Sequence, residues 1–149
     1  MDKPFYQFTV LNEARRFDFV SVGKEEISKT ITFSKTEEPD IYTLMLANVR
    51  PNGSLDIRTV SNNGDMKKIL VTVYKAIEIF LTDEPDAIVI FSGSSDARTR
   101  LYQISISKEL SMLNDRFKVY GVTKDGFELF RANQRYCAFV ISLKNTNIV

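Results

Sequence analysis

The sequence contains no histidine among its 149 residues. Histidine is the side chain that most often acts as a general base, activates serine and cysteine nucleophiles, and binds zinc. Its absence therefore excludes Ser-His and Cys-His catalysis and removes the commonest zinc ligand, and we expect no metal site. Any chemistry would have to rely on carboxylates, tyrosine, lysine, the one cysteine or backbone groups.

Cysteine is nearly absent, and long apolar runs are missing. Cys137 is the only cysteine, so it cannot form an intramolecular disulfide, and its apolar neighbours predict that it packs as a small hydrophobic residue. No segment approaches the roughly 20 apolar residues that span a bilayer. Residues 1–4 do not resemble the apolar core of a signal peptide. We therefore expect a cytoplasmic location and no contact with a membrane.

The charges of the chain nearly cancel, with a formal net charge of +1. This balance argues against general attraction to nucleic acid, although a local basic patch is compatible with it. Hydrophobic residues make up 44% and charged residues 26% of the chain, which is typical of a soluble globular protein. The length predicts a single domain over residues 1–149.

The first part of the chain alternates between apolar and polar residues and is interrupted by turn signals. This pattern predicts an antiparallel meander of five strands, at residues 5–10, 17–22, 27–34, 41–47 and 55–60. The turn before the fifth strand is marked by the sequence Pro51-Asn52-Gly53.

The apolar period then changes from that of a strand to that of a helix. Residues 66–82 carry a wide apolar stripe, Asp65 suits the N-cap position, and Pro85 prevents continuation. The next segment, residues 87–91, is uniformly apolar and predicts a strand that is covered on both faces.

A second helix is predicted to begin after Ser94-Ser95-Asp96, which supply capping side chains. Its expected inward residues are Ala97, Leu101 and Ile104. Alternation of apolar and polar residues predicts a break at residues 105–107, followed by a short helical piece. The remaining predicted strands lie at residues 117–122 and 136–143.

The order strand, helix, strand over residues 55–91 predicts a right-handed crossover between two parallel strands. The fold class is therefore α+β, a single mixed sheet in which an antiparallel meander is followed by a β-α-β-α-β-β order, with the helices packed on the sheet. If strands 55–60 and 87–91 are parallel, the loops that follow them leave the sheet at the same edge, where ligands commonly bind.

Both loops lead into helix N-termini, which carry unsatisfied N–H groups and a partial positive charge. Such ends attract phosphate or carboxylate. Arg98 and Arg100 support the hypothesis of an anion-binding site at these loops. A cation is disfavoured in the first turn of a helix, whereas two arginines together suit a bound anion. The predicted ligand is phosphate- or carboxylate-bearing, and the candidate binding residues are Asn62, Asn63, Gly64, Asp65, Gly93, Ser94, Ser95, Arg98, Arg100 and Tyr102.

Two other interpretations stay open. In a purely structural one, the arginines pair with carboxylates and the serines only cap the helix. In a regulatory one, Lys67 and Lys68 join the arginines in a basic rim that contacts nucleic acid or a protein, although the near-neutral charge does not favour nucleic acid. Arg131 and Arg135 flank a polar loop before the last strand, and nothing in the sequence places that loop.

The motif Ser61-Asn62-Asn63-Gly64-Asp65 precedes the first helix, and Gly93-Ser94-Ser95-Asp96-Ala97-Arg98-Thr99-Arg100-Leu101-Tyr102 opens the second. Together they resemble a family of uncharacterised bacterial proteins of about this length. The resemblance runs over most of the chain, and it implies a family without implying an activity.

The order of elements is also similar to the core of the GNAT N-acetyltransferases. This resemblance implies acetyl-CoA as cofactor and an acyl-CoA-dependent N-acyltransferase as an alternative function. Ala97-Arg98-Thr99-Arg100-Leu101-Tyr102 is similar to a motif of that family's last helix whose tyrosine serves as general acid, and this implies that role for Tyr102. The loop at residues 61–65 departs from the family's phosphate-binding motif because it has a single glycine. Whether the protein is an enzyme therefore stays open.

Overall fold

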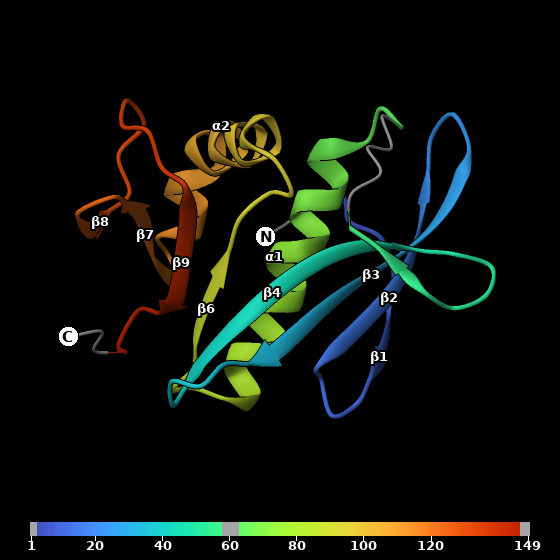
Figure 1. The fold of residues 1–149 in the computed structure, drawn as a ribbon, viewed down its shortest axis with the longest axis horizontal. Coiled ribbons are helices and arrows are strands. Elements are labelled where there is room, and N and C mark those ends of the chain that lie inside the picture. Colours follow the sequence, from blue (N-terminus) through green and yellow to red (C-terminus); the bar gives the residue numbers. More distant parts are fainter. Residues whose placement is uncertain (1–2, 58–62, 147–149) are drawn as a thin grey trace. The chain divides into compact units, whose positions relative to one another are not determined.

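A computed structural model describes residues 3–57 and 63–146 of the chain (Figure 1). The strands that precede the first helix are β1 (Thr9–Leu11), β2 (Arg16–Val22), β3 (Glu26–Lys35), β4 (Ile41–Val49) and β5 (Leu55–Asp56). The elements that follow are α1 (Met66–Asp83), β6 (Ile88–Phe91), α2 (Asp96–Leu113), β7 (Phe117–Thr123), β8 (Gly126–Leu129) and β9 (Ala138–Leu143).

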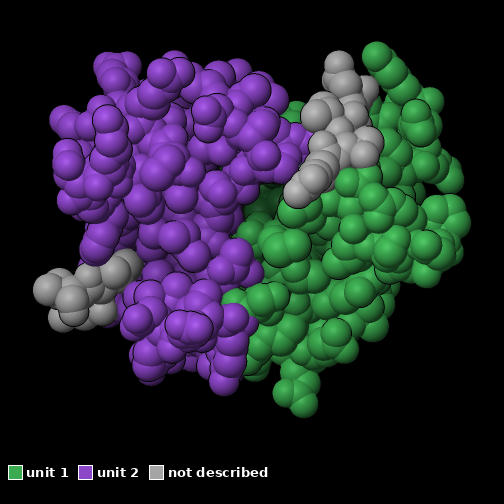
Figure 2. Space-filling view, viewed as in Figure 1, with its two compact units in different colours: residues 1–34, 44–83 green, residues 35–43, 84–149 purple. Residues whose placement is uncertain are grey.

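Within the described residues, nine strands form one mixed sheet in the order β1-β2-β3-β4-β6-β9-β7-β8, and β5 pairs with β4 outside this series. The predicted α+β class with a single mixed sheet is confirmed. The chain divides into two compact units, which Figure 2 colours separately. Unit 1 comprises residues 1–34 and 44–83, and unit 2 comprises residues 35–43 and 84–149. The single domain expected from the length stays a prediction.

Unit 1 begins with the predicted meander. β1 pairs antiparallel with β2, which places Val10 opposite Phe17, and β2 pairs antiparallel with β3, which places Phe17 opposite Ile31. The first strand begins later than predicted because the backbone N–H of Tyr6 donates to the side chain of Thr72 on α1, at 2.9 Å, rather than to a strand.

Helix α1 occupies the predicted positions and packs on β3. The stacked rings of Phe33 and Phe80, with centroids 4.3 Å apart, join the strand to the helix. Ile69 N donates to the carbonyl of Asp65 at 3.0 Å, which puts Asp65 at the predicted N-cap position. In the part of the chain that the structure describes, neither helix is long and apolar enough to cross a bilayer.

The predicted parallel crossover from strand 55–60 to strand 87–91 is wrong. The parallel partner of β6 is β4, with Ile41 opposite Ile88. β5 is short and pairs antiparallel with β4, because the turn at Gly53, whose φ is 87°, folds the chain directly back. Residues 58–60 lie outside the described residues. The pairing of these strands therefore gives no reason to expect the two loops at one edge of the sheet.

Unit 2 is organised around β9, which pairs antiparallel with β6 on one side and with β7 on the other. β8, which the sequence analysis does not predict, pairs antiparallel with β7. The core contains Phe91 and Phe139, whose ring centroids are 5.5 Å apart, and Tyr102 of α2 packs on Phe91 at 6.2 Å.

The predicted inward face of the second helix is also wrong. α2 is continuous over residues 105–107, and Ala97, Leu101 and Ile104 are exposed. The buried residues are Thr99, Tyr102, Gln103, Ile106, Glu109 and Leu113. Three of these six are polar, so apolar residues alone indicate the wrong stripe of the helix.

Two isoleucines of α2 provide a matched test of this orientation. Ile106 is 1% exposed, whereas Ile104 is 43% exposed. Ile106→Ala should lower the free energy of unfolding by about 2–5 kcal/mol because it leaves a cavity. Ile104→Ala should change it by less than about 0.5 kcal/mol. Urea denaturation of both variants measures the difference, and the reverse order would contradict the orientation of the helix.

Candidate functional site

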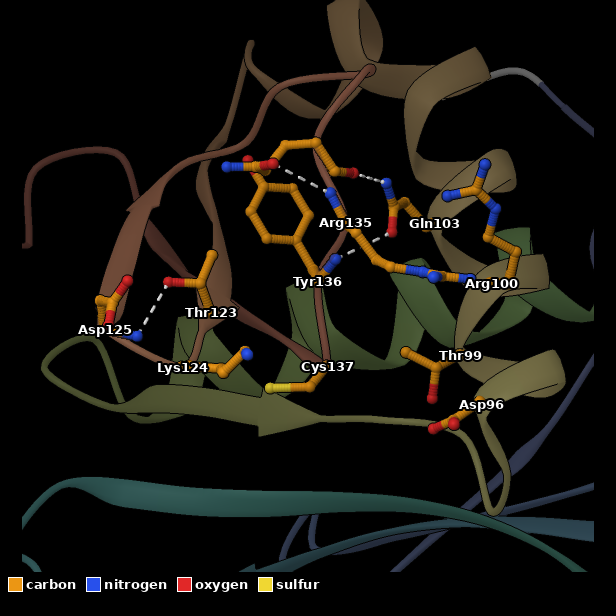
Figure 3. A pocket seen from close by; sticks show the side chains of 11 residues that line it. Asp96, Thr99, Arg100, Gln103, Thr123, Lys124, Asp125, Arg135, Tyr136 and Cys137 are labelled. Carbon is orange, nitrogen blue, oxygen red and sulfur yellow. Dashed lines mark hydrogen bonds between the residues drawn. The ribbon is translucent and has the colours of Figure 1, made fainter.

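Unit 2 contains a pocket of about 450 Å³. Its walls are the first turns of α2, the turn between β7 and β8, and the segment that leads into β9 (Figure 3). The residues that line it are Asp96, Thr99, Arg100, Gln103, Thr123, Lys124, Asp125, Gln134, Arg135, Tyr136 and Cys137. A pocket of this size falls within the range of small-molecule sites.

Gln103 joins two walls of the pocket. Its side chain is 3% exposed; Nε2 donates to the carbonyl of Gln134, and Oε1 accepts from the N–H of Tyr136 at 3.4 Å (Figure 3). The amide therefore binds the backbone on both sides of Arg135. Because both ends of the amide are engaged, Gln103 holds this segment against α2.

Tyr136 anchors the same segment from the other side. Its hydroxyl donates to Glu128 Oε2 at 2.8 Å and accepts from the N–H of Arg131 at 3.0 Å. Arg131 Nε donates to the same carboxylate at 2.8 Å. The tyrosine ring lies over Gly121, where a side chain would collide with it. Glycine is therefore needed at that point of β7.

These contacts determine the ionisation states of Tyr136 and Glu128. Burial and the hydrogen bond to Glu128 raise the pKa of Tyr136, so its hydroxyl stays protonated at neutral pH. The hydrogen bonds from Arg131 and Tyr136 lower the pKa of Glu128, which therefore stays ionised as the acceptor. Tyr136 acts as a structural donor in this arrangement.

The rim of the pocket is charged. Arg100, Lys124 and Arg135 supply cations, Asp96 and Asp125 supply carboxylates, and all five side chains are exposed. Among the residues that the structure describes, none of these three cations makes an ion pair. The side chain of Arg135 extends toward α2, where Arg100 lies (Figure 3). Two guanidinium groups therefore offer their N–H donors to one cavity.

Of the residues predicted for the second loop, Arg100 lines the pocket, while Gly93, Ser95 and Arg98 form hydrogen bonds at the start of α2. Ser95 is the N-cap, and its hydroxyl accepts from Arg98 N at 3.2 Å. Gly93 N donates to the hydroxyl of Thr99 at 2.9 Å. A Cβ on Gly93 would lie 2.5 Å from the backbone nitrogen of Thr99, so only glycine permits this close approach. Ser94 is exposed.

Tyr102 lies in the core of unit 2. It is buried against Phe91, and it is not one of the residues that line the pocket. The general-acid role implied by the acetyltransferase resemblance stays a prediction, and this position does not support it.

The residues predicted for the first loop lie in unit 1, and Asn62 lies outside the described residues. Asn63 is 4% exposed. Its Oδ1 accepts from Glu25 N at 3.0 Å, and its Nδ2 donates to Glu25 O at 2.9 Å and to Ser21 Oγ at 3.0 Å. Gly23 lets this loop approach, because a Cβ there would collide with the carbonyl of Asn63. Gly64 adopts a positive φ of 77°.

The carboxylate of Asp65 is engaged by two hydroxyl groups. Tyr6 and Ser21 each donate to its Oδ2 at 2.5 Å. Burial and the hydrogen bond to Asp65 raise the pKa of Tyr6, which keeps this donor protonated. The polar side chains of Asn63 and Asp65 thus bind other groups of unit 1, and their predicted role in an anion site stays a prediction.

A comparison with protein families identifies a relationship over nearly the whole sequence. The model of a family of unknown function, DUF6934, matches residues 2–144 of the 149. The chain belongs to the DUF6934 family. The predicted membership of a family without an assigned activity is thereby confirmed. No curated protein and no solved structure matches this DUF6934 chain, and the resemblance to the GNAT acetyltransferases is not confirmed.

Of the eleven residues that line the pocket of this DUF6934 protein, Arg100 is the one that the sequence analysis names as a binding residue. The ten that it does not name as binding residues include Gln103, Lys124 and Arg135. Nothing in the sequence indicates that the loop with Arg135 packs beside α2. Cys137 is exposed, so the prediction that it packs as a hydrophobic residue is wrong. The buried strand begins only at Ala138, and the thiol of Cys137 donates to the carbonyl of Val122 at 3.3 Å.

Gly93→Ala should destabilise the DUF6934 chain. The added Cβ would force the strand and the start of α2 apart, and such overpacking costs about 1–3 kcal/mol. Thermal unfolding measures the loss, with Ser94→Ala as the neighbouring control at an exposed position. An unchanged melting temperature for Gly93→Ala would show that the close approach is not required.

Gln103→Met should loosen the segment that carries Arg135. The substitution keeps the length of the side chain and removes both hydrogen bonds, which leaves two backbone groups unsatisfied at a cost of about 1–3 kcal/mol. Hydrogen exchange at the amide of Tyr136 should accelerate, while exchange at the amide of Ile69 on α1 serves as the reference. Unchanged protection of Tyr136 would contradict the role of Gln103.

Proposed function

We propose that the chain is a binding module whose unit 2 holds a small anionic ligand, bearing phosphate or carboxylate, in this pocket. One observation carries the proposal: Arg100 and Arg135 line the same cavity and, among the described residues, neither makes an ion pair. Arginine is well suited to such ligands, because its planar fork matches the oxygens of carboxylate and phosphate.

The charge of the rim supports the proposal. Two guanidinium groups at one cavity repel each other, and an anion between them converts this repulsion into attraction. Lys124 adds a third positive charge from the β7–β8 turn. The pocket also lies beside the first turns of α2, whose N-terminus contributes a partial positive charge. Asp96 and Asp125 oppose these charges, which leaves one net positive charge among the five charged lining residues.

The buried lining residues support binding rather than proton transfer. Gln103 and Tyr136 are already hydrogen-bonded to groups of the protein, and the raised pKa of Tyr136 keeps its hydroxyl protonated. These two residues hold the walls in place, and the exposed arginines contact the ligand. A preformed arrangement of this kind reduces the entropy lost when a ligand binds.

The test is a titration of the protein with inorganic phosphate and with malate, followed by NMR. Arg100→Ala and Arg135→Ala should each weaken binding by about tenfold or more, because each removes charge-assisted hydrogen bonds. Binding should also weaken as salt is added, since the arginines are exposed.

Arg98→Ala is the matched control, because Arg98 lies on the same helix but is not among the lining residues. Its affinity for the probes should stay within about twofold of the unmodified protein. Failure of both probes to shift any pocket resonance at millimolar concentration would refute the proposed function.

A further inference from the structure

The two carboxylates of the rim distinguish this pocket from a simple anion site. Resting on the proposed function, we infer that the ligand is a phosphate monoester of a small molecule with hydroxyl or amino groups. The pocket has features suited to both ends of such a molecule. Arg100 and Arg135 bind the phosphate. Asp96 and Asp125 bind hydrogen-bond donors of the rest of the molecule, which we call its body.

The number of cations favours phosphate over carboxylate. A single guanidinium already matches the two oxygens of a carboxylate in a bidentate pair. This pocket offers two guanidinium groups and the ammonium group of Lys124. A phosphate monoester carries three acceptor oxygens and about −1.5 to −2 charges at neutral pH, so it suits a lining with several cations better than a carboxylate does.

The size of the pocket and its carboxylates require a ligand with a body. Inorganic phosphate fills only a small part of about 450 Å³. Asp96 and Asp125 are exposed, and neither makes an ion pair among the described residues. Ionised carboxylates only accept hydrogen bonds, so they repel a bare anion but bind hydroxyl or ammonium groups.

The residues that line the pocket argue against recognition of a nucleobase. Proteins commonly bind bases by stacking them on an accessible aromatic face. Among the described residues that line the pocket, Tyr136 is the one aromatic side chain, and it is 5% exposed. Its ring packs against Phe130, with centroids 5.4 Å apart, and against Phe139 at 6.4 Å. The lining therefore offers a base no accessible aromatic face, whereas the hydrogen-bond donors of a ligand would meet carboxylates.

The experiment compares matched probes by calorimetry with the full chain. Ribose phosphate and adenosine monophosphate differ mainly by the base, phosphoethanolamine supplies an amino group, and inorganic phosphate and malate complete the set. Ribose phosphate or phosphoethanolamine should bind about tenfold or more tightly than inorganic phosphate and malate. The base should add less than about twofold to the affinity. Tighter binding of ribose phosphate identifies hydroxyl groups as the donors, and tighter binding of phosphoethanolamine identifies the amino group.

Asp96→Asn and Asp125→Asn test the role of the carboxylates. Removing a negative charge should raise the affinity for inorganic phosphate. The ratio by which the tighter-binding ester, ribose phosphate or phosphoethanolamine, is preferred over inorganic phosphate should fall by about threefold or more. A merely structural role for these side chains would change both affinities in the same direction.

The outcomes separate this inference from the proposed function. Binding of adenosine monophosphate about tenfold tighter than ribose phosphate, or of malate as tightly as the phosphate esters, would overturn the inference while leaving the anion site intact. Equal affinity for inorganic phosphate and the esters, or an unchanged preference in both asparagine variants, would also overturn it. If no probe binds, the proposed function fails together with the inference.

Discussion

The buried amide of Gln103 is the constraint on which the pocket depends. Its two hydrogen bonds bind the backbone before and after Arg135 to the side of α2. A buried amide without partners would be strongly unfavourable, so this side chain and this segment stabilise each other. The position of one exposed arginine thus follows from a polar group inside the protein.

The need of buried polar groups for hydrogen-bond partners also explains the positions of Asn63 and Asp65 before α1. Asn63 and Asp65 look like ligand-binding residues in the sequence because such residues are common in loops at helix N-termini. In the structure, the amide of Asn63 binds the backbone at Glu25, and the carboxylate of Asp65 accepts from Tyr6 and Ser21. Burial makes unsatisfied polar groups costly, and polar side chains of this unit are used to satisfy one another.

Much of the fold was predictable from local pattern, and the site was predictable only in part. Helix α1 follows from a strong apolar period, and Ser95 as the cap of α2 follows from its side chain. The inward face of α2 was not predictable, because Thr99 and Gln103 are buried through hydrogen bonds that no local pattern contains. Arg100 was identified from its unfavourable place in a first turn, whereas Arg135 gave no such signal.

The sequence by itself determined the α+β class, helix α1, the start of helix α2 and the exclusion of histidine chemistry, because composition and periodicity are local properties. Only the tertiary structure decided that β4, rather than the strand after Gly53, pairs parallel with β6. Only the tertiary structure brought Arg135 to the pocket that Arg100 lines. Both outcomes depend on pairing between residues far apart in the chain, and such pairing is selected by the packing of the whole unit.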